Sequence, residues 1–521
     1  MKKYFENIKY DFPAGLVVYL VALPLCLGVA SASTGRPDLL FSGIIAGMVG
    51  GIVVGILSGS ALGVSGPAAG LVVIVLNALT TLGSYEAFLL AVVIAGIIQL
   101  IAGFLRAGII GHYFPSSVIK GMLAAIGITL ILKEIPHALG FDKDFMGDES
   151  FDQIDGHNTF SDIYYAVVYN SFGAIIISIV SIGLILLFDR PFMKKVQLFK
   201  FLPGSLFVVL VGILINQAYA IISPELFLNG EHLVQLPVAS TFQQFISFFT
   251  TPDFSQFSNI NVYKVAFTLA IVASLETLLS VEATDKLDPY KRNTPTNKEL
   301  KAQGIGNIVS GLIGGLPITQ VIVRSSANIS SGGRTKLATI IHGAILLVSA
   351  ILIPRYLNYI PIASLAAILL LVGYKLAKVS LFKGMYKLGA DQFIPFVVTV
   401  IAILSTDLLK GIAIGMCVAI YFILRKNYKY SYSYKKETHN KDEVIRLVLS
   451  EEVSFLNKGS ILQTLDHIPP KSKVIIDGSK SNNIDYDVIE IIYDYKKHTA
   501  PLRNIQVELI AIPETEKIEA H

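Results

Sequence analysis

The sequence lacks tryptophan, holds only two cysteines and is poor in charge, since Asp, Glu, Lys and Arg make up 15% of its 521 residues. Soluble domains carry about 25% charged residues, so a soluble globular chain is excluded. Both cysteines, Cys26 and Cys417, lie within apolar runs, which argues against a disulfide framework and against a metal site. The small net charge of +4 argues against nucleic acid as a partner.

Long apolar runs dominate the sequence, and 53% of its residues are hydrophobic. Two further apolar stretches, 62–80 and 316–331, are interrupted by Gly, Pro and Ser. The first run is too long for a cleavable signal peptide and is predicted to be a spanning helix. All these stretches together predict an α-helical polytopic membrane protein with fourteen segments. The uninterrupted runs are 13–33, 39–58, 86–105, 117–135, 165–188, 203–220, 262–283, 303–315, 336–353, 359–374, 393–406 and 411–425.

Lysine and arginine cluster in three connecting segments, 188–202, 285–301 and 375–387. In a fourteen-segment chain all three lie on the same side as the basic N-terminus, whereas the acidic segment 141–162 lies on the other side. Because Lys- and Arg-rich loops remain in the cytoplasm, the N- and C-termini are predicted to be cytoplasmic. We expect a multi-pass protein of the cell membrane, that is, the inner or plasma membrane.

The two interrupted stretches resemble each other, one containing GVSGPAAG with Pro67 and the other GGLPITQ with Pro317. The two prolines are 250 residues apart, which is about seven segments. Because seven is odd, the second half would enter the membrane in the opposite sense to the first. Paired interruptions at one offset are typical of inverted repeats whose discontinuous helices meet near the middle of the membrane. The alternative is that Gly and Pro are simply common in membrane helices.

Irregular backbone inside a membrane persists only where protein buries it or where it lines a cavity. We therefore interpret Ser65-Gly66-Pro67 as a helix start, with Ser or Gly as the cap and Pro in the first turn. The unpaired N–H groups of such an end attract anions, so two facing ends predict an anion site. Arg324, near the start of the second interrupted helix, would add a full charge and a forked donor. A snorkelling or structurally paired arginine is the alternative.

Glu276 is an acidic residue near the middle of its segment, and Ser280 lies four residues further along on the same helical face. Glu276 is a candidate to neutralise Arg324, to bind a coupling cation or to take up a proton; a purely structural salt bridge is the alternative. We expect His342 to be a hydrogen-bonded core histidine rather than a proton relay. Asn77 is a weaker candidate for lining the site.

The composition changes at the end of the apolar part, which divides the chain into three. Residues 1–425 are predicted to form the membrane domain and residues 426–443 a basic linker rich in Lys and Tyr. Residues 444–521 contain strand-like VIRLVLS and KVIIDGS, a helix-like segment at 486–497 and a last strand at 505–512. Strands that alternate with helices predict a small cytoplasmic α/β domain.

The sequence resembles the SulP family of sulfate permeases and inorganic anion transporters, which has a prestin-like fold. The resemblance is carried by SGPAAG at 65–70, by GIGNIVSGLIGGLPITQVIVRSSANISSGGRTKLA at 304–338 and more weakly by the tail, which is similar to a short STAS domain. It implies two inverted seven-segment repeats, a core and a gate domain, a homodimer and an elevator-like motion. It also implies an anion site between the third and tenth segments.

The resemblance assigns roles to residues by position, with substrate contacts from the third and tenth segments and a coupling ion or proton on the eighth. No catalytic residue, metal ligand or cofactor is implied, apart from a coupling proton or sodium ion. The implied substrate-binding residues are Ser65, Gly66, Ala68, Gln320, Val321, Ile322, Val323 and Arg324, and the implied coupling residues are Glu276 and Ser280.

The sequence departs from this family at two places. Sodium-coupled members carry Asp in the eighth segment and a Gly-Ala-Thr run in the tenth, where this chain has Glu276 and Gln320-Val321-Ile322. Proton coupling, sodium coupling and no coupling therefore all stay open. In the tail, which is short, Tyr486 follows Asp485 where a phosphorylatable Ser would stand, so neither nucleotide binding nor phosphorylation control is assumed.

These observations predict a secondary active transporter of a small inorganic oxyanion, bicarbonate or sulfate, with lipid as its surroundings and no nucleic-acid partner. One alternative is a nucleobase:proton symporter of the same fold, although Arg324 and the apolar Val321-Ile322 argue against it. A membrane enzyme is the other alternative. The sequence offers no nucleophile motif, phosphate loop or metal-ligand cluster for it, so the protein is not expected to be an enzyme.

Overall fold

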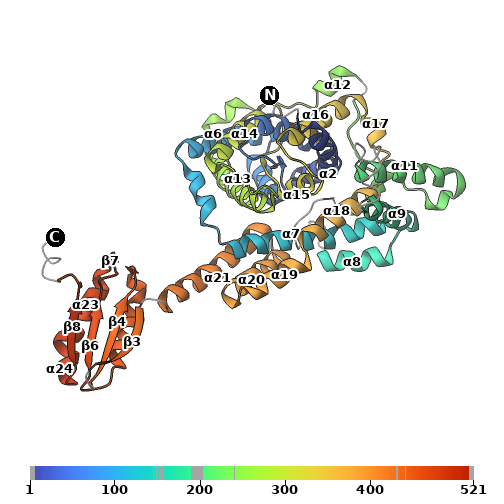
Figure 1. Cartoon of the computed structure of the whole chain (residues 1–521). Helices are drawn as coiled ribbons and strands as arrows, with labels where there is room; N and C mark the ends of the chain where they lie inside the picture. The colour runs from blue at the N-terminus through green and yellow to red at the C-terminus, as the bar shows by residue number, and fades with distance from the viewer. Residues whose placement is uncertain are drawn as a thin grey trace. The chain divides into compact units, whose positions relative to one another are not determined.

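The computed structural model describes residues 6–144, 146, 151, 158–188, 190, 203–239, 241–429, 432–439 and 442–514. Two compact units divide the chain, Met1–Met416 and Cys417–His521, and each is described by itself (Figure 1). The predicted domain boundaries at 425 and 443 stay a prediction. Several charged residues used to predict the orientation lie outside the described residues. They are Lys2, Lys3, Lys194, Lys195, Lys200, Asp148, Glu149, Asp152 and Asp155.

The described residues contain fourteen segments in two sets of seven, which confirms the predicted fold class. Six helices are long and apolar enough to cross a membrane, and several of the others are shorter or interrupted. The first seven are α2 (Ile8–Thr34), α3–η2–α4 (Phe41–Leu57), β1 (Ser65–Pro67) with α5 (Val72–Leu82), α6 (Tyr85–Phe104), α7 (Ser116–Leu139), α9 (Phe172–Phe188) and α11 (Gly204–Ile222). The second seven are α13 (Ile260–Leu287), α14 (Thr296–Leu312), β2 (Ile318–Gln320) with α15 (Ile322–Ser330), α16 (Leu337–Leu352), α18 (Ile362–Leu376), α20 (Ala390–Ser405) and α21 (Leu408–Lys429).

The segments pack as two helical groups, a core and a gate. In the core, α2, α6, α13, α14, α15 and α16 surround the two short strands (Figure 1). In the gate, α7 packs against α18 and α20, and α9 packs against α11 and α18. Each repeat thus gives its first four segments to the core and its last three to the gate.

Glycine pairs allow the closest helix contacts in both groups. A Cβ added to Gly304 of α14 would lie 2.7 Å from the carbonyl oxygen of Gly96 in α6. In the gate, a Cβ on Gly373 of α18 would lie 2.7 Å from the carbonyl oxygen of Gly127 in α7. Such close backbone approach through small residues is a main source of helix association in lipid.

The two interrupted segments meet as a two-stranded antiparallel sheet, which corrects one prediction. Ser65 pairs with Gln320, and Pro67 pairs with Ile318. Ser65-Gly66-Pro67 is therefore a strand and not a helix start. The helical turns begin after Ala68, which is extended with φ −121°. The reason is that the backbone groups of each interrupted segment find partners in the other segment, a pairing that local capping rules do not foresee.

A polar stripe on α14 holds this small sheet. Asn307 donates from Nδ2 to the carbonyl oxygen of Ile318 (3.0 Å) and accepts from the N–H of the same residue (2.6 Å). The Ser310 hydroxyl donates to the carbonyl oxygen of Leu316 (2.7 Å), and Gln303 donates to the Ser65 hydroxyl (2.7 Å). Gln303, Asn307 and Ser310 lie on one face of the helix because they are three and four residues apart.

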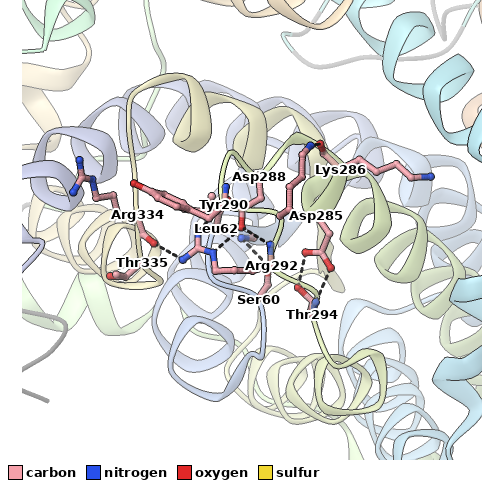
Figure 2. Close-up of polar contacts among 12 residues, drawn as sticks. Ser60, Leu62, Asp285, Lys286, Asp288, Tyr290, Arg292, Thr294, Arg334 and Thr335 are labelled. Atoms are coloured by element: carbon pink, nitrogen blue, oxygen red, sulfur yellow. Dashed lines mark hydrogen bonds and ion pairs between the residues drawn. The ribbon is translucent and has the colours of Figure 1, made fainter. Parts of the chain in front are cut away.

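On the face of the core where α2 begins, polar contacts tie the loop after α13 to the loop before α16 (Figure 2). The Arg292 guanidinium donates from Nε to Asp288 (2.7 Å) and from Nη1 to the carbonyl oxygen of Arg334 (2.7 Å). Burial raises the pKa of Asp288, but the hydrogen bonds from Arg292 and from the N–H of Tyr290, together with the charge of Arg292, hold that pKa below its usual value. The buried carboxylate of Asp11 accepts from the N–H groups of Arg334 (2.7 Å) and Thr335 (3.0 Å). The ends of α2, α13 and α15 are therefore joined.

On the opposite face, Asp142 joins two histidines. Its carboxylate oxygens lie 2.7 Å from Nδ1 of His137 at the end of α7 and 2.7 Å from Nδ1 of His232, which follows α11. Burial by itself raises the pKa of Asp142. The hydrogen bonds and charges of His137 and His232 together have the larger effect, so that the pKa lies below its usual value. Asp142 also borders a cavity of about 290 Å³. Residues of α2 in the core line one side of this cavity, and loop residues with the start of α18 in the gate line the other.

The second unit contains a four-stranded sheet in the order β3-β4-β6-β8, consistent with a STAS-like domain. β3 (Tyr432–His439) is antiparallel to β4 (Asp442–Leu449), whereas β6 (Lys473–Asp477) and β8 (Gln506–Ile510) continue the sheet in parallel. The unit also contains the helices α22 (Lys458–Asp466), α23 (Tyr486–Asp494) and α24 (Ala500–Leu502), and a short parallel pair of strands, β5 (Glu452–Val453) and β7 (Asn483–Ile484). The three predicted strands and the predicted helix are confirmed, and β3 occupies part of the segment that was predicted as a linker.

The two hydrogen bonds between the Asn307 side chain and the backbone of Ile318, called the Asn307 clamp, lead to a prediction about stability. Asn307→Ala leaves a buried N–H and a buried carbonyl without partners, so we expect the free energy of unfolding to fall by about 2–4 kcal/mol. Thermal unfolding in detergent measures the change. The matched control is Asn77→Ala, because Asn77 is an exposed asparagine on α5. An equal effect of the two substitutions would show that the clamp does not stabilise the sheet.

Candidate functional site

Arg324 lies in the first turn of α15 and is 1% exposed. Its Nη2 donates to the carbonyl oxygen of Pro67 at 3.3 Å, so the arginine reaches across to the other interrupted segment. Nε and Nη1 are buried and have no hydrogen-bond partner among the described residues. The guanidinium packs on Gly66, where a Cβ would lie 1.9 Å from Nη1. The structure therefore presents a buried cation with open donors.

A small cavity of about 20 Å³ borders this arginine, with room for about one water molecule. Pro67 and Ala69 line it from the first interrupted segment, and Val321 and Val323 line it from the second. Leu25 and Val29 of α2 and Leu130 of α7 complete the lining. Because α7 belongs to the gate, the cavity lies where the core meets the gate.

The starts of α5 and α15 both reach this cavity. β1 and β2 are antiparallel, so the helices that follow them leave from opposite ends of the small sheet. Each helix start contributes a partial positive charge of about half an elementary charge. Two helix starts and one guanidinium thus concentrate positive potential in one apolar place, an arrangement that suits a small anion.

Glu276 lies on α13 beside the start of the first interrupted helix and is 6% exposed. A Cβ on Gly70 would lie 3.0 Å and 3.1 Å from its two carboxylate oxygens, so the carboxylate packs against the backbone just before α5. Ser280 is buried one turn further along α13. An acidic group therefore stands next to one of the two positively polarised helix starts.

Other residues implied as substrate contacts face neighbouring helices. The Ser65 hydroxyl accepts from Gln303 of α14, and the Gln320 side chain donates to Thr284 of α13 at 3.0 Å. Ala68 and Ile322 are buried beside the small sheet. Of the eight implied substrate contacts, Val321, Val323 and Arg324 line the cavity and Gly66 supports the guanidinium. Asn77 is exposed on α5.

Sequence reasoning missed several residues that form or support the site. Leu25, Val29 and Leu130 line the cavity, but nothing separates them in sequence from other apolar residues of their helices. Gln303 and Asn307 were also missed, although their spacing on α14 is a readable signal. Polar residues four apart inside a membrane segment indicate a face that contacts protein or water.

His342 overturns the expectation of a hydrogen-bonded core histidine. It is fully buried in α16, and neither ring nitrogen has a hydrogen-bond partner among the described residues. The Cys26 thiol of α2 is also fully buried. No group of three or more His, Cys, Asp or Glu in the described part of the chain is placed to hold a metal ion.

The model of the Sulfate permease family matches residues 8–422, and the chain belongs to this family. Its members are transporters and not enzymes. The match covers all the elements that form the site.

Individual relatives agree with this assignment. YvdB of Bacillus subtilis, whose name describes a candidate sulfate transporter, is 27% identical over 90% of this chain and 85% of its own length. The bicarbonate transporter BicA of Picosynechococcus is 25% identical over 88% of this chain and 77% of its own length. The fold is similar to that of the murine Slc26a9 anion transporter in the inward-facing state, with a TM-score of 0.68 at 16% identity over 98% of this chain and 86% of that one.

Proposed function

We propose that this protein is a secondary active transporter of a small inorganic oxyanion, either bicarbonate or sulfate. The observation that carries the proposal is Arg324, a buried arginine with two unpartnered nitrogens at the start of a half-helix. Relatives whose names describe sulfate and bicarbonate transporters support the substrate class.

The anion binds between the starts of α5 and α15 and accepts hydrogen bonds from Nε and Nη1 of Arg324. Hydrogen bonds to charged groups contribute about 1.5–3 kcal/mol each, and each helix end adds about 0.3–2 kcal/mol. Val321 and Val323 keep water away from the anion and strengthen these interactions. Gly66 leaves the space in which the guanidinium lies.

Transport proceeds by an elevator-type alternating-access motion of the core against the gate. Two observations support this motion. The cavity is walled on one side by α2 and α15 of the core and on the other by Leu130 of the gate. The core is also internally tied, because Arg292 (Figure 2) and Asp11 join the ends of its helices. A tied core moves as one body and carries the bound anion with it.

Glu276 couples anion binding to a second ion, either a proton or sodium. Its carboxylate packs against Gly70 at the start of α5, and Ser280 on the same helix supplies a hydroxyl nearby. A cation or proton at Glu276 removes the negative charge that opposes an anion at the same helix start. We further propose a homodimer in the cell membrane with both termini in the cytoplasm, as the basic loops indicate.

The nucleobase:proton symporter is disfavoured by the site. Recognition of a nucleobase by hydrogen bonds requires carboxylate and amide groups that face the ligand. The amide of Gln320 is hydrogen-bonded to Thr284, and the neighbouring cavity wall is apolar.

Uptake into proteoliposomes tests the function. We expect labelled sulfate or bicarbonate to accumulate when a proton or a sodium gradient is imposed, with the two gradients varied separately. Labelled uracil serves as the comparison substrate. Accumulation of uracil with neither anion transported would overturn the proposal.

Replacing the arginine removes the full charge from the site. Arg324→Ala should weaken anion affinity by about 10–100-fold, the loss of one or two charge-assisted hydrogen bonds. Arg324→Lys keeps the positive charge but loses the two parallel N–H donors of the guanidinium. We therefore expect its anion affinity to lie between that of the native protein and that of the alanine variant. Affinity is measured by isothermal titration of the anion into purified protein. Native affinity in Arg324→Ala would exclude the arginine from the site.

Adding one methyl group at Gly66 tests whether the space at this glycine positions the guanidinium of Arg324. Gly66→Ala places a Cβ 1.9 Å from Nη1 of Arg324 and must displace the side chain. We expect an uptake rate at least tenfold lower, with protein yield and detergent elution profile unchanged. Gly384→Ala is the matched control, because a Cβ there meets no atom within 4 Å. If both variants transport alike, Gly66 does not position the arginine.

Removing the charge of Glu276 tests the coupling. Glu276→Gln keeps the size of the side chain but titrates no proton and binds cations weakly. We expect the dependence of uptake on pH or on sodium to flatten, while counterflow exchange of labelled anion persists. Retention of both dependences would remove Glu276 from coupling.

A further inference from the structure

Glu299 is a fully buried carboxylate of the core that the proposed mechanism does not use. It lies in the first turn of α14 at 0% exposure. Its Oε2 accepts from the Ser58 hydroxyl (2.5 Å) and from the N–H of Gly59 (3.2 Å), and its Oε1 accepts from Nε2 of Gln303 (3.1 Å). An ionised carboxylate only accepts hydrogen bonds, and all three of these groups are donors. Such a set offsets the cost of burying the charge.

Two of these donors belong to residues 58–65, the segment that leads into the first half of the anion site. The Ser58 hydroxyl also accepts from the N–H of Ser60 (2.9 Å), so the start of the segment is folded around its contact with Glu299. Gly59 packs on the start of α14, since a Cβ there would lie 3.0 Å from Cδ of the proline that precedes the helix. The carboxylate therefore fixes the start of the segment against α14.

The end of the same segment is also tied to Glu299, through Gln303. The Nε2 group of Gln303 donates to the Ser65 hydroxyl (2.7 Å) as well as to the carboxylate. The middle of the segment is held by another helix, because the carbonyl oxygen of Leu62 accepts from Asn328 of α15 (3.0 Å). The segment therefore bridges α14 and α15, and Glu299 acts at both of its ends.

The position of Ser65 affects the anion site because the next two residues contact the Arg324 guanidinium. A Cβ on Gly66 would lie 1.9 Å from Nη1, and Nη2 donates to the carbonyl oxygen of Pro67 at 3.3 Å. Because N–H···O hydrogen bonds are usually about 2.7–3.2 Å long, the contact with Pro67 is already long and a small shift of the strand breaks it. Such a shift also redirects the open Nε and Nη1 donors, and with them the fit of the anion.

We propose that Glu299 is a positioning residue for the anion site. Its carboxylate holds both ends of segment 58–65 on α14 and thereby keeps Gly66 and Pro67 against the Arg324 guanidinium. Glu299 does not belong to the described residues that line the cavity beside the arginine, so it acts through this segment and not on the anion itself. The inference deepens the proposed function and rests on it, because the effect of Glu299 is measured in anion binding.

The test measures anion affinity and thermal unfolding on the same samples of purified full-length protein in detergent. Isothermal titration with sulfate, or with bicarbonate if sulfate does not bind, gives both the affinity and the number of sites per molecule. For Glu299→Ala we expect an affinity about tenfold weaker, equivalent to the loss of one hydrogen bond to the anion, with an unchanged number of sites. A residue that only stabilises the fold would lower the unfolding temperature and the number of sites, but not the affinity of the molecules that stay folded.

Two further variants complete this comparison. Glu86→Ala, at an exposed glutamate in the first turn of α6, is the matched control and should bind the anion like the native protein. Glu299→Gln should lose less affinity than Glu299→Ala, because Gln303 can turn its Oε1, which has no hydrogen-bond partner among the described residues, toward the new amide.

Exchanging the two hydrogen-bonding groups gives a second test that leaves no cavity. Gln303→Glu alone places two carboxylates side by side, so we expect it to lose affinity as Glu299→Ala does. In the double variant Glu299→Gln/Gln303→Glu, the amide at position 299 accepts from Ser58 and Gly59 and donates to the carboxylate at position 303, to which the Ser65 hydroxyl then donates. We expect the affinity of the double variant to return to within about threefold of the native value, as coupled neighbours do in a double-mutant cycle.

Each result supports or overturns the inference. Native affinity in Glu299→Ala overturns it, and so does a loss of sites while the remaining sites keep their affinity. A double variant that binds no better than Gln303→Glu alone also overturns it, and this comparison decides if Glu299→Ala does not fold. If neither anion binds to the native protein, the proposed function fails and the inference fails with it. If the native protein binds an anion and these variants bind it equally well, the inference alone fails.

Discussion

Arg324 places a full positive charge inside an apolar helical unit, at a cost of about 2.5–3.5 kcal/mol on insertion scales. The elements around it are arranged to hold that charge. Pro67 of the other repeat accepts one hydrogen bond, Gly66 leaves the space for the guanidinium, and two nitrogens remain open. A charge held in this way needs an anion as its partner, which is why the site, the family membership and the proposed transport are consistent.

The small sheet between the repeats is what brings the two helix starts to one cavity. Its strands are only three residues long, and side chains of α14 bind both of them. Asn307 pairs with the backbone of Ile318 much as a third strand would, and Gln303 holds Ser65. Glycine pairs at the α6–α14 and α7–α18 contacts give the core and the gate separate tight packing.

Much of the fold could be predicted because membrane segments can be recognised in a sequence by their hydrophobicity and by the charges of the loops between them. The fourteen segments, the two interrupted spans and the small α/β unit were all predicted. The interpretation of Ser65-Gly66-Pro67 as a helix start was wrong, because the backbone groups of that segment pair with residues about 250 positions away. The expectation for His342 was wrong for a similar reason. Whether a buried ring nitrogen has a partner depends on neighbouring helices and not on the local sequence.

The sequence by itself determined the membrane setting, the inverted repeat and the arginine at the second interruption, because apolar length, loop charge and the spacing of the two prolines are visible along the chain without knowledge of its contacts. Only the tertiary structure decided which side chains share the cavity. It placed Val321, Val323 and Arg324 at the cavity wall, turned Ser65 and Gln320 toward neighbouring helices, and set Glu276 against Gly70. The physical reason is that a side chain's direction in a paired strand or a packed helix is fixed by its contacts with distant segments, which no local pattern encodes.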